Sequence, residues 1–532
     1  MIARYFGKSE RTVRRWEAEE GLPVQRHMHR VQGSIFAWES DLARWQAARS
    51  EESSSALTEE AAGDALVVMP FLYHGADAAQ AFLAVGFTDE LIADLTRIGS
   101  LRIISRTSSH ALSGRGLSVA EIRKLLKVEH LVEGFVTQSG KDLKVTVQLI
   151  DCKRDRSIWS HTAVCSRDTV FAAQAELAKA VADALGRSVP RGDEEERRGR
   201  DRYIWETLVR ARIEALKWTP SGIGNAIRLL KTSMDEFGPD PGLVSALGRC
   251  HLFLRETGAD MGEGPMASAR ECLVQLQRSA PQSWETYHLA GWLAYQRGDV
   301  ASAIHSLRSA QQTYQDDPDT LALLSYCYLL SGLDDCAAPL IERLLSRDPL
   351  TPLNHSLRAC QDLFAGRHEA AVRGYEHMCA LDPSNALAQL FLVMAMSLAG
   401  DREAVVARVE EMAGAADGSP VDRLLHAFAD AVRGCPIGSV PHADDMILAS
   451  TVDMFPRLMA QAHGLSGDQP AALRWLRIAF ERGFGHDRFI ARHDPSFAAL
   501  REHEEFRGLC DEMKARRTSL KKALDAERGR QA

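Results

Sequence analysis

Long apolar runs are absent from this 532-residue chain. Without a run of about 20 apolar residues, the sequence offers no membrane-spanning helix. Its first residues, MIARYFGKSE, lack the apolar centre of a secretory signal. The ten cysteines are scattered and form no C-x-x-C pair, which argues against a zinc site or a disulfide framework. We therefore expect small buried cysteines in a reducing cytosol, and a cytoplasmic protein without a metal or membrane contact.

Sequence motifs for nucleophilic or metal-dependent catalysis are missing too. The stretch GRG at 114–116 is too short for a phosphate loop. Asp89, Glu90 and Asp94 share helical spacing, but a solvated helix face explains these carboxylates better than an acid–base pair. The polar run 105–110 follows a predicted strand end, where α/β folds often bind ligands. A polar loop is the preferred reading and an anion site the alternative, so we expect no catalytic residue, no cofactor and no enzymatic activity.

Two charged stretches, 49–64 and 187–202, separate three regions of different pattern. Apolar residues make up 45% of the chain, which suits packed domains, and the net charge is -8. We predict a multidomain α+β protein. Its parts are a small winged helix-turn-helix at 1–48, a mixed α/β domain at 65–187 and an all-α solenoid with a terminal cap at 203–515.

The middle region alternates between strand-like and helix-like periods. ALVVMPF reads as a buried strand, and residues 78–98 have helical spacing. A second strand, a short amphipathic helix, two alternating strands around Ser139–Gly140, another strand and a last helix follow. This order predicts a mixed sheet backed by helices.

A 34-residue repeat of glycines marks the carboxyl-terminal half. The series is Gly264, Gly298, Gly332, Gly366 and Gly400, continued within one residue by Gly434 and Gly467. An Ala follows several of these glycines five residues later, whereas Ser439 follows Gly434, so that match could be coincidence. Prolines at 281, 349 and 383 would close second helices. The pattern predicts helix pairs with a left-handed glycine turn between them.

Such a repeat resembles the tetratricopeptide family, which implies a concave groove lined by the first helix of each pair. Counting from the glycines places seven side chains in this groove: His288, Trp292, Tyr295, Tyr326, Leu330, Phe364 and Met394. An aromatic and apolar groove suits a protein or peptide with apolar anchors. The alternative is a groove filled by the chain's own terminal helices.

The head of the chain is basic, although the protein is acidic. Residues 1–50 carry nine basic and six acidic side chains, a net charge of +3. Ser9 can cap a helix on which Val13 and Trp16 share the apolar face, leaving the arginines exposed. Two short strands around Gly33 would form a wing. The predicted contacts with double-stranded DNA are Lys8, Ser9, Arg11, Thr12, Arg14, Arg15, Arg26, His27 and Arg30.

The stretches RTVRRWE and EGLP resemble the MerR and excisionase winged helix-turn-helix, in which the second helix reads the major groove. The short first helix predicts a true start upstream of Met1. The long dimerising helix of that family is missing, so a homodimer remains open. Residues 65–186, with VVMPF, FLAVGFTDELIADL and LVEGFV, resemble the amino-terminal-like TolB domain of bacterial regulators, which implies an interaction role.

Two functional hypotheses follow. The first is a DNA-binding transcriptional regulator whose middle domain and repeats recruit or sense a protein partner. The second is a tetratricopeptide scaffold with a vestigial helix-turn-helix. The alternative for the head itself is a structural domain whose arginines pair with Glu17, Glu19 and Glu20.

Overall fold

The computed structural model describes residues 25–28, 33–36, 65–75, 80–98, 101–139, 142–166, 169–187, 202–215, 217, 219–256, 260, 262–412, 420–437 and 452–531. Residue contacts divide the chain into two compact units, Met1–Ala65 and Leu66–Ala532. Within the described residues of the second unit, no helix is both long enough and apolar enough to cross a membrane. All ten cysteines are unpaired, and seven of them are buried.

The first unit contains one described hairpin. Strands β1 (Gln25–Met28) and β2 (Gly33–Phe36) pair antiparallel, with Met28 opposite Gly33. This hairpin lies where the sequence predicts the wing. The predicted helices lie outside the described residues, as do Lys8, Ser9, Arg11, Thr12, Arg14, Arg15 and Arg30. For Arg26 and His27 only the backbone is described, so the DNA contacts stay predictions.

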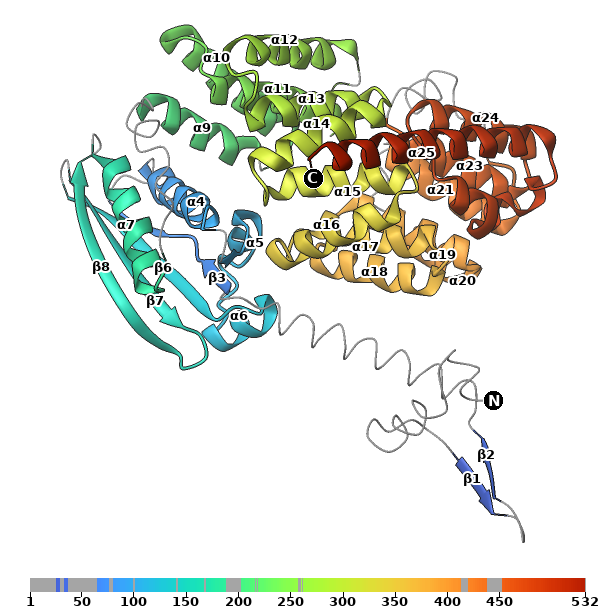
Figure 1. Cartoon of the computed structure of the whole chain (residues 1–532), viewed down its shortest axis with the longest axis horizontal. Helices are drawn as coiled ribbons and strands as arrows, with labels where there is room; N and C mark the ends of the chain where they lie inside the picture. The colour runs from blue at the N-terminus through green and yellow to red at the C-terminus, as the bar shows by residue number, and fades with distance from the viewer. Residues whose placement is uncertain are drawn as a thin grey trace. The chain divides into compact units, whose positions relative to one another are not determined.

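The second unit begins with a six-stranded mixed sheet (Figure 1). Its order is β5-β3-β6-β7-β8, with β4 also paired to β6. Strands β3 and β4 run parallel to β6, whereas β6–β7 and β7–β8 are antiparallel. The strands are β3 (Ala65–Val68), β4 (Leu72–His74), β5 (Arg102–Ile103), β6 (His130–Ser139), β7 (Asp142–Asp151) and β8 (Arg156–Ser166). The predicted hairpin and the strand after it are β6, β7 and β8.

Helices α4 (Phe82–Thr96) and α7 (Val170–Ala184) pack on one face of this sheet. The domain also contains the short helices α5 (Arg106–Ala111) and α6 (Val119–Leu126). Alternation along β7 buries Leu143, Val145 and Val147 beneath the helices. The sequence predicted three of these helices and missed the one-turn α5 and the short β4.

The sheet domain shares its core with the next helix, α9 (Arg202–Ala215). Trp205 is 1% exposed and packs with Val209 against α4. Gly86 provides the space, because a Cβ at this position would lie 2.3 Å from the Trp205 ring. Helix α9, which the sequence assigned to the solenoid, therefore also completes the core of the sheet domain.

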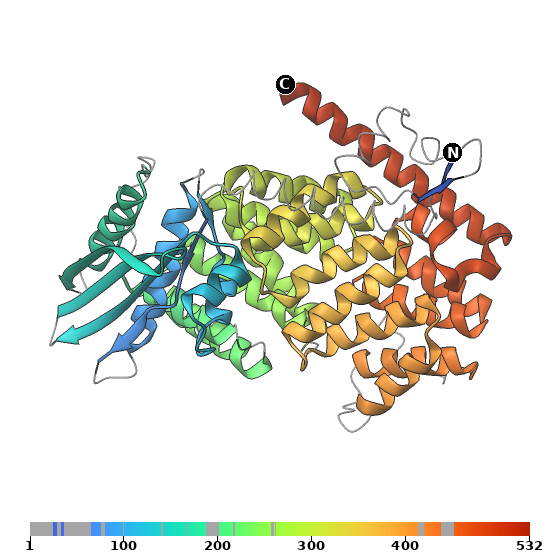
Figure 2. The same cartoon turned by 90° about the horizontal axis from the view of Figure 1, so that it is seen from below.

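Paired helices form the rest of the unit (Figure 2). The first helices are α9, α11 (Pro241–Glu256), α13 (Trp284–Gln296), α15 (Pro318–Leu330), α17 (Pro352–Phe364), α19 (Ala386–Ala399), α21 (Pro420–Arg433) and α23 (Met454–Ser466). The second helices are α10 (Pro220–Phe237), α12 (Glu263–Ser279), α14 (Val300–Thr313), α16 (Asp334–Arg347), α18 (His368–Leu381), α20 (Arg402–Met412) and α24 (Gln469–Glu481). The chain ends with η3 (Phe489–His493), η4 (Pro495–Leu500) and α25 (Glu504–Gln531).

The glycine repeat marks the turns inside the pairs. Six members have positive φ, between 65° and 86°: Gly298, Gly332, Gly366, Gly400, Gly434 and Gly467. Gly434 is thus a true member, whereas Gly264 lies inside α12 and is not. The predicted prolines each follow the end of a second helix by two residues. Small residues allow close packing as predicted, since a Cβ at Gly291 would lie 2.6 Å from Leu307.

Candidate functional site: the inner face of the helical repeats

The seven side chains predicted to line a groove lie on first helices, but most of them are buried. Six have exposed fractions between 0% and 8%: His288, Trp292, Tyr295, Leu330, Phe364 and Met394. Tyr326 is half-buried. The structure therefore does not present these residues as an open groove, because other parts of the same chain contact them.

Three aromatic side chains follow one another along α13. The His288 ring lies 5.0 Å from Trp284 and 5.8 Å from Trp292, measured between ring centroids. His288 Nδ1 lies 3.0 Å from the hydroxyl of Thr320, which itself donates to Asp317 at 2.7 Å. Burial lowers the pKa of His288 to about 3, so this ring is neutral at physiological pH. The network joins α13 to the start of α15.

A buried ion pair lies further along the inner face. The Tyr326 ring packs 5.9 Å from Tyr295, and its hydroxyl donates to Asp453 at 3.2 Å. Asp453 is fully buried at the start of α23, and its carboxylate lies 3.9 Å from Arg457. Burial raises the pKa of Asp453 to about 6, although the charge of Arg457 opposes the shift.

The ring of Phe364 on α17 is covered by residues that follow α24. Its centroid lies 6.0 Å from Phe484 and 4.6 Å from Phe489. The guanidinium of Arg457 lies 5.6 Å from the Phe364 ring and 5.5 Å from the Phe484 ring. Cation–π contacts of this kind partly replace the water that a buried guanidinium loses.

These covering residues belong to what we call the return segment, residues 482–494 between α24 and η4. It runs back past the turns of earlier helix pairs. The amide of Gly485 donates to the carbonyl of Leu330 at 2.8 Å. Arg488 donates to the carbonyl of Gly332 at 2.7 Å. The chain itself thus occupies the part of the predicted groove that lies at the end of α15 and at α17.

Two repeat glycines meet the ends of the return segment. A Cβ at Gly298 would lie 2.8 Å from the backbone of Arg482, and one at Gly366 would lie 2.7 Å from the His493 ring. By contrast, a Cβ at Gly400 would meet nothing within 4 Å. At Gly298 and Gly366 the missing side chain therefore permits contact as well as the left-handed turn.

The last helix adds to this closure. Figure 1 shows α25 reaching from α24 back towards α14 and α15. Glu527 near its end accepts from Arg308 on α14 at 2.7 Å, and Arg517 donates to Asp487 at 2.7 Å. The sequence allowed two alternatives, a groove open to a peptide and a groove filled by the chain's own terminal helices. The contacts at α15 and α17 favour filling of the groove by the chain itself. The return segment and α23 cover its interior, so terminal helices alone do not account for it.

The polar run 105–110 joins the sheet domain to the solenoid. Ser105 and Ser108 donate to the same carboxylate oxygen of Asp348, at 2.5 Å and 2.7 Å. The amide of Leu350 donates back to the Ser108 hydroxyl at 2.9 Å. These bonds use the side chains that an anion site would need. The partners are more than 200 residues apart, so no local sequence pattern indicates this contact.

Two of the three carboxylates on α4 are buried, so the expectation of a solvated face was wrong for Asp89 and Asp94, whereas Glu90 is half-buried. Asp89 is 3% exposed and Asp94 is 4% exposed. Asp89 accepts from Arg212 on α9 at 2.6 Å, and Arg106 lies at 3.8 Å. Burial alone would raise the pKa of Asp89, but these arginines hold it well below its usual range. The Asp89 carboxylate therefore forms an ion pair between α4 and α9, which argues against a role in acid–base chemistry.

Part of the inner face keeps solvent contact. We call this part the inner patch; it comprises Arg249, Phe253, Glu256, Trp284 and Asp319. Arg249 pairs with Asp319 at 2.7 Å, and their side chains are 26% and 58% exposed. The same guanidinium lies 5.9 Å from the Trp284 ring. The patch thus combines an accessible ion pair with a half-buried indole.

Glu256 supplies a second carboxylate to the inner patch. It is exposed at the end of α11 and accepts from Trp292 at 2.8 Å and Gln296 at 3.0 Å. Phe253, one turn earlier, packs edge-on against Trp292 with centroids 5.2 Å apart. Trp292 therefore holds both residues in place, and the patch carries two carboxylates against one guanidinium.

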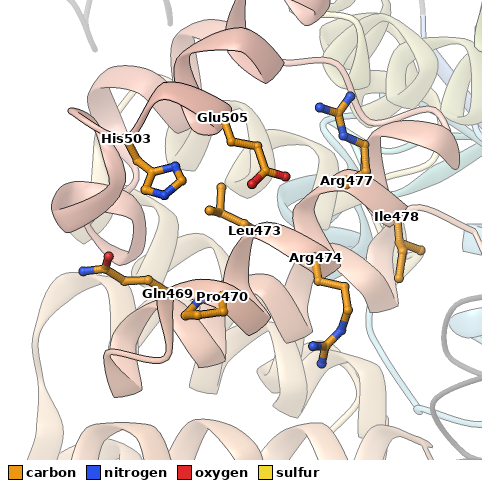
Figure 3. A pocket seen from close by; sticks show the side chains of 8 residues that line it. All are labelled: Gln469, Pro470, Leu473, Arg474, Arg477, Ile478, His503 and Glu505. Atoms are coloured by element: carbon orange, nitrogen blue, oxygen red, sulfur yellow. The ribbon is translucent and has the colours of Figure 1, made fainter.

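A surface hollow of about 500 Å³ lies between α24 and the start of α25 (Figure 3). Its lining residues are Gln469, Pro470, Leu473, Arg474, Arg477, Ile478, His503 and Glu505. Arg474 points away from His503 and Glu505 in Figure 3, so the charged groups do not converge. Among the described residues there is also no cluster of three side chains able to hold a metal ion.

The 34-residue period, the paired helices and the left-handed glycine turns define a tetratricopeptide-type solenoid joined to a mixed sheet domain. No protein-family model matches the chain. It is 28% identical over 184 residues to a Rhizobium meliloti protein named "Putative adenylate cyclase 3". That match covers 34% of this chain and only 31% of the relative's length.

Two solved structures are also similar to the chain. A thermophilic tetratricopeptide protein of Thermus thermophilus is 20% identical with a TM-score of 0.30, covering 36% of this chain and 98% of its own. A tetratricopeptide repeat protein of Parabacteroides merdae is 10% identical with a TM-score of 0.32, covering 53% and 100%. Neither likeness extends to function.

Proposed function

We propose that the chain is a protein-interaction scaffold without catalysis of its own, and that a partner binds the inner patch. One observation carries this proposal. The return segment covers the inner face at α17, whereas Arg249, Glu256 and Asp319 keep solvent contact on α11 and α15. A partner can therefore reach this part of the inner face without displacing the return segment.

The chemistry of the patch favours a basic segment with an apolar anchor. Asp319 is already paired with Arg249, so Glu256 is the carboxylate that a basic partner would meet. Desolvation raises the pKa of Glu256 to about 7, so it is partly protonated in the free chain and a bound cation would stabilise its charged form. Trp284 and Phe253 are half-buried and offer apolar contact beside it. Interface energy concentrates where an aromatic anchor and a charged pair are desolvated together.

Selection of peptides from a random displayed library on the purified full chain tests this idea. We expect enriched peptides to carry Lys or Arg next to an aromatic or aliphatic residue. Glu256→Lys should weaken their binding by about tenfold or more, since a charge reversal at a desolvated contact costs over about 1.4 kcal/mol. Glu271→Lys makes the same change at an exposed site on α12 and serves as the control. Equal losses in both variants, or none, would refute the site.

A DNA-binding head is the second candidate, and the hairpin β1–β2 favours it. This hairpin lies at the predicted wing, in the basic first 50 residues of an acidic protein. A regulator would then use the solenoid to take its signal from a protein partner. If that partner pairs two copies, two heads bind far more tightly than one.

A gel-shift selection with full-length protein at two salt concentrations tests the head. We expect sequence-selective retention that weakens steeply at higher salt, because phosphate contacts release counterions. Arg11→Ala with Arg14→Ala should abolish it. Retention that is unchanged in this double variant would reject the assigned contacts. If the unaltered protein shows no retention at either salt concentration, the DNA-binding function is rejected and only the scaffold function remains.

A further inference from the structure

Strand β8 is the terminal strand of the six-stranded sheet. It spans eleven residues, Arg156–Ser166, and pairs with β7 on one side only. Figures 1 and 2 draw no other described element along its free edge. Strands in globular proteins are usually about five or six residues long, and a long free edge is a template for pairing with another chain.

The composition of β8 does not protect this edge. Its only permanent charge is Arg156 at the first position, and the run IWSHTAVC at 158–165 has neither charge nor proline. Strand β8 carries one bulge against β7, near its start. Ser157 faces Ile150 and Trp159 faces Leu149, so Ile158 is the extra residue and 159–166 pair regularly. Ile158 and Val164 are 42% and 68% exposed. Edge strands normally carry lysines, prolines or bulges that prevent association, and here the single bulge at Ile158 leaves 159–166 without such protection.

The strand is complementary to itself around His161. Antiparallel self-pairing centred on this residue places Ile158 opposite Val164 and Ser160 opposite Thr162, so apolar meets apolar and hydroxyl meets hydroxyl. Only every second residue of an edge strand directs its N–H and C=O outward. Two copies can therefore pair only through residues of equal parity, and a register centred on a residue satisfies this requirement.

We propose that β8 pairs antiparallel with β8 of a second copy of this chain, around a two-fold axis at His161. The two sheets become one continuous sheet, and the interface is self-complementary as a two-fold dimer requires. Cross-strand neighbours lie about 4.5–5.5 Å apart, close enough for Ile158 and Val164 to exclude water from each other. This proposal does not depend on the inner patch or on the DNA-binding head.

Sedimentation of the full chain over a wide concentration range tests the proposal. We expect a dimer that Ile158→Lys or Val164→Glu weakens by about tenfold or more, since each removes an apolar cross-strand pair. The double variant Ile158→Lys with Val164→Glu should restore dimerisation in a salt-sensitive way, because the new Lys faces the new Glu of the second copy. Leu72→Lys, which charges an exposed apolar site on β4, is the control.

Disulfide trapping tests the register separately. His161→Cys places two thiols on the axis at a separation that a disulfide accepts, whereas Ser160→Cys faces Thr162. We expect oxidation to link the first variant between copies and not the second. A monomer at every concentration overturns the proposal, as does a dimer insensitive to both charged variants. Equal trapping at 160 and 161 overturns the register. Circular dichroism verifies that each variant is folded.

Discussion

The hydroxyl of Ser108 donates a 2.7 Å hydrogen bond to the buried carboxylate of Asp348, across 240 residues of sequence. Asn354 donates to the other oxygen at 2.7 Å, so this carboxylate joins α5 of the sheet domain to the turn between α16 and α17. A backbone hydrogen bond joins the same two elements, since the amide of Ser105 donates to the carbonyl of Arg347 at 2.7 Å.

Asp348→Ala should loosen this contact. The substitution leaves the hydroxyls of Ser105 and Ser108 without their acceptor, and it removes one of the two hydrogen bonds that Asn354 donates. A buried unsatisfied group costs about 1–3 kcal/mol. We expect the free energy of local opening at 106–111, measured by amide hydrogen exchange, to fall by about 2 kcal/mol. Asp382→Ala removes a half-buried carboxylate one repeat later and should leave exchange at 106–111 unchanged. Equal exchange in the two variants would contradict the assigned role of Asp348.

Comparing Gly298→Ala with Gly400→Ala distinguishes two contributions to stability, the left-handed turn and the contact with the return segment. Both glycines have left-handed backbones, with φ of 81° and 86°, so both variants lose about 1–2 kcal/mol of stability from backbone strain. Only at Gly298 would the new Cβ also lie 2.8 Å from the backbone at Glu481 and Arg482. We therefore expect a clearly lower Tm and faster exchange at 482–494 for Gly298→Ala. Matching Tm values would show that the return segment does not need the glycine.

Arg457→Met should release the return segment. The variant keeps a long apolar side chain but loses the guanidinium that faces Asp453, Phe364 and Phe484. Removing one partner of a buried ion pair costs about 3–5 kcal/mol. Limited proteolysis should then cut within 482–494. Arg477→Met breaks an exposed pair with Glu512 and should cost under about 1 kcal/mol. Protection that is equal in both variants would show that Arg457 does not anchor the segment.

Stability should depend on pH through Asp453. The folded-state pKa of about 6 lies above the value in the unfolded chain. The folded state therefore keeps this proton longer, and the stability that it contributes is present below about pH 4 and is lost as the pH rises to about 6. Asp453→Asn carries no such proton. Between about pH 4 and pH 7 its stability should gain about 3 kcal/mol relative to the unaltered chain. Parallel pH profiles from chemical denaturation would contradict this.

Local patterns of the sequence were enough to predict the helix pairs and every described strand except the short β4. The spacing of Gly298, Gly332, Gly366 and Gly400 predicted the left-handed turns, because positive φ is a local backbone requirement that glycine meets best. Alternation along β7 predicted its buried face for a similar reason, since successive side chains of a strand point to opposite faces. The hairpin β1–β2 also lies where the wing was predicted.

Contacts between segments that are distant in the sequence could not be predicted from local patterns. Asp89 was expected in water because its helix pattern says nothing about Arg212, which lies 123 residues later. Phe364 was expected in an open groove because the repeat places first helices on the inner face but does not say what else returns there. Phe484 and Phe489 cover it only because the chain doubles back after α24.

The sequence by itself thus determined the period, the turns and most of the strands, all of which depend on interactions within a few residues or one repeat. Only the tertiary structure decided which surfaces stay accessible. Burial and ion pairing depend on which distant segments meet, and a repeat of similar helices leaves that choice to a small number of specific contacts such as Ser108 with Asp348 and Arg457 with Asp453.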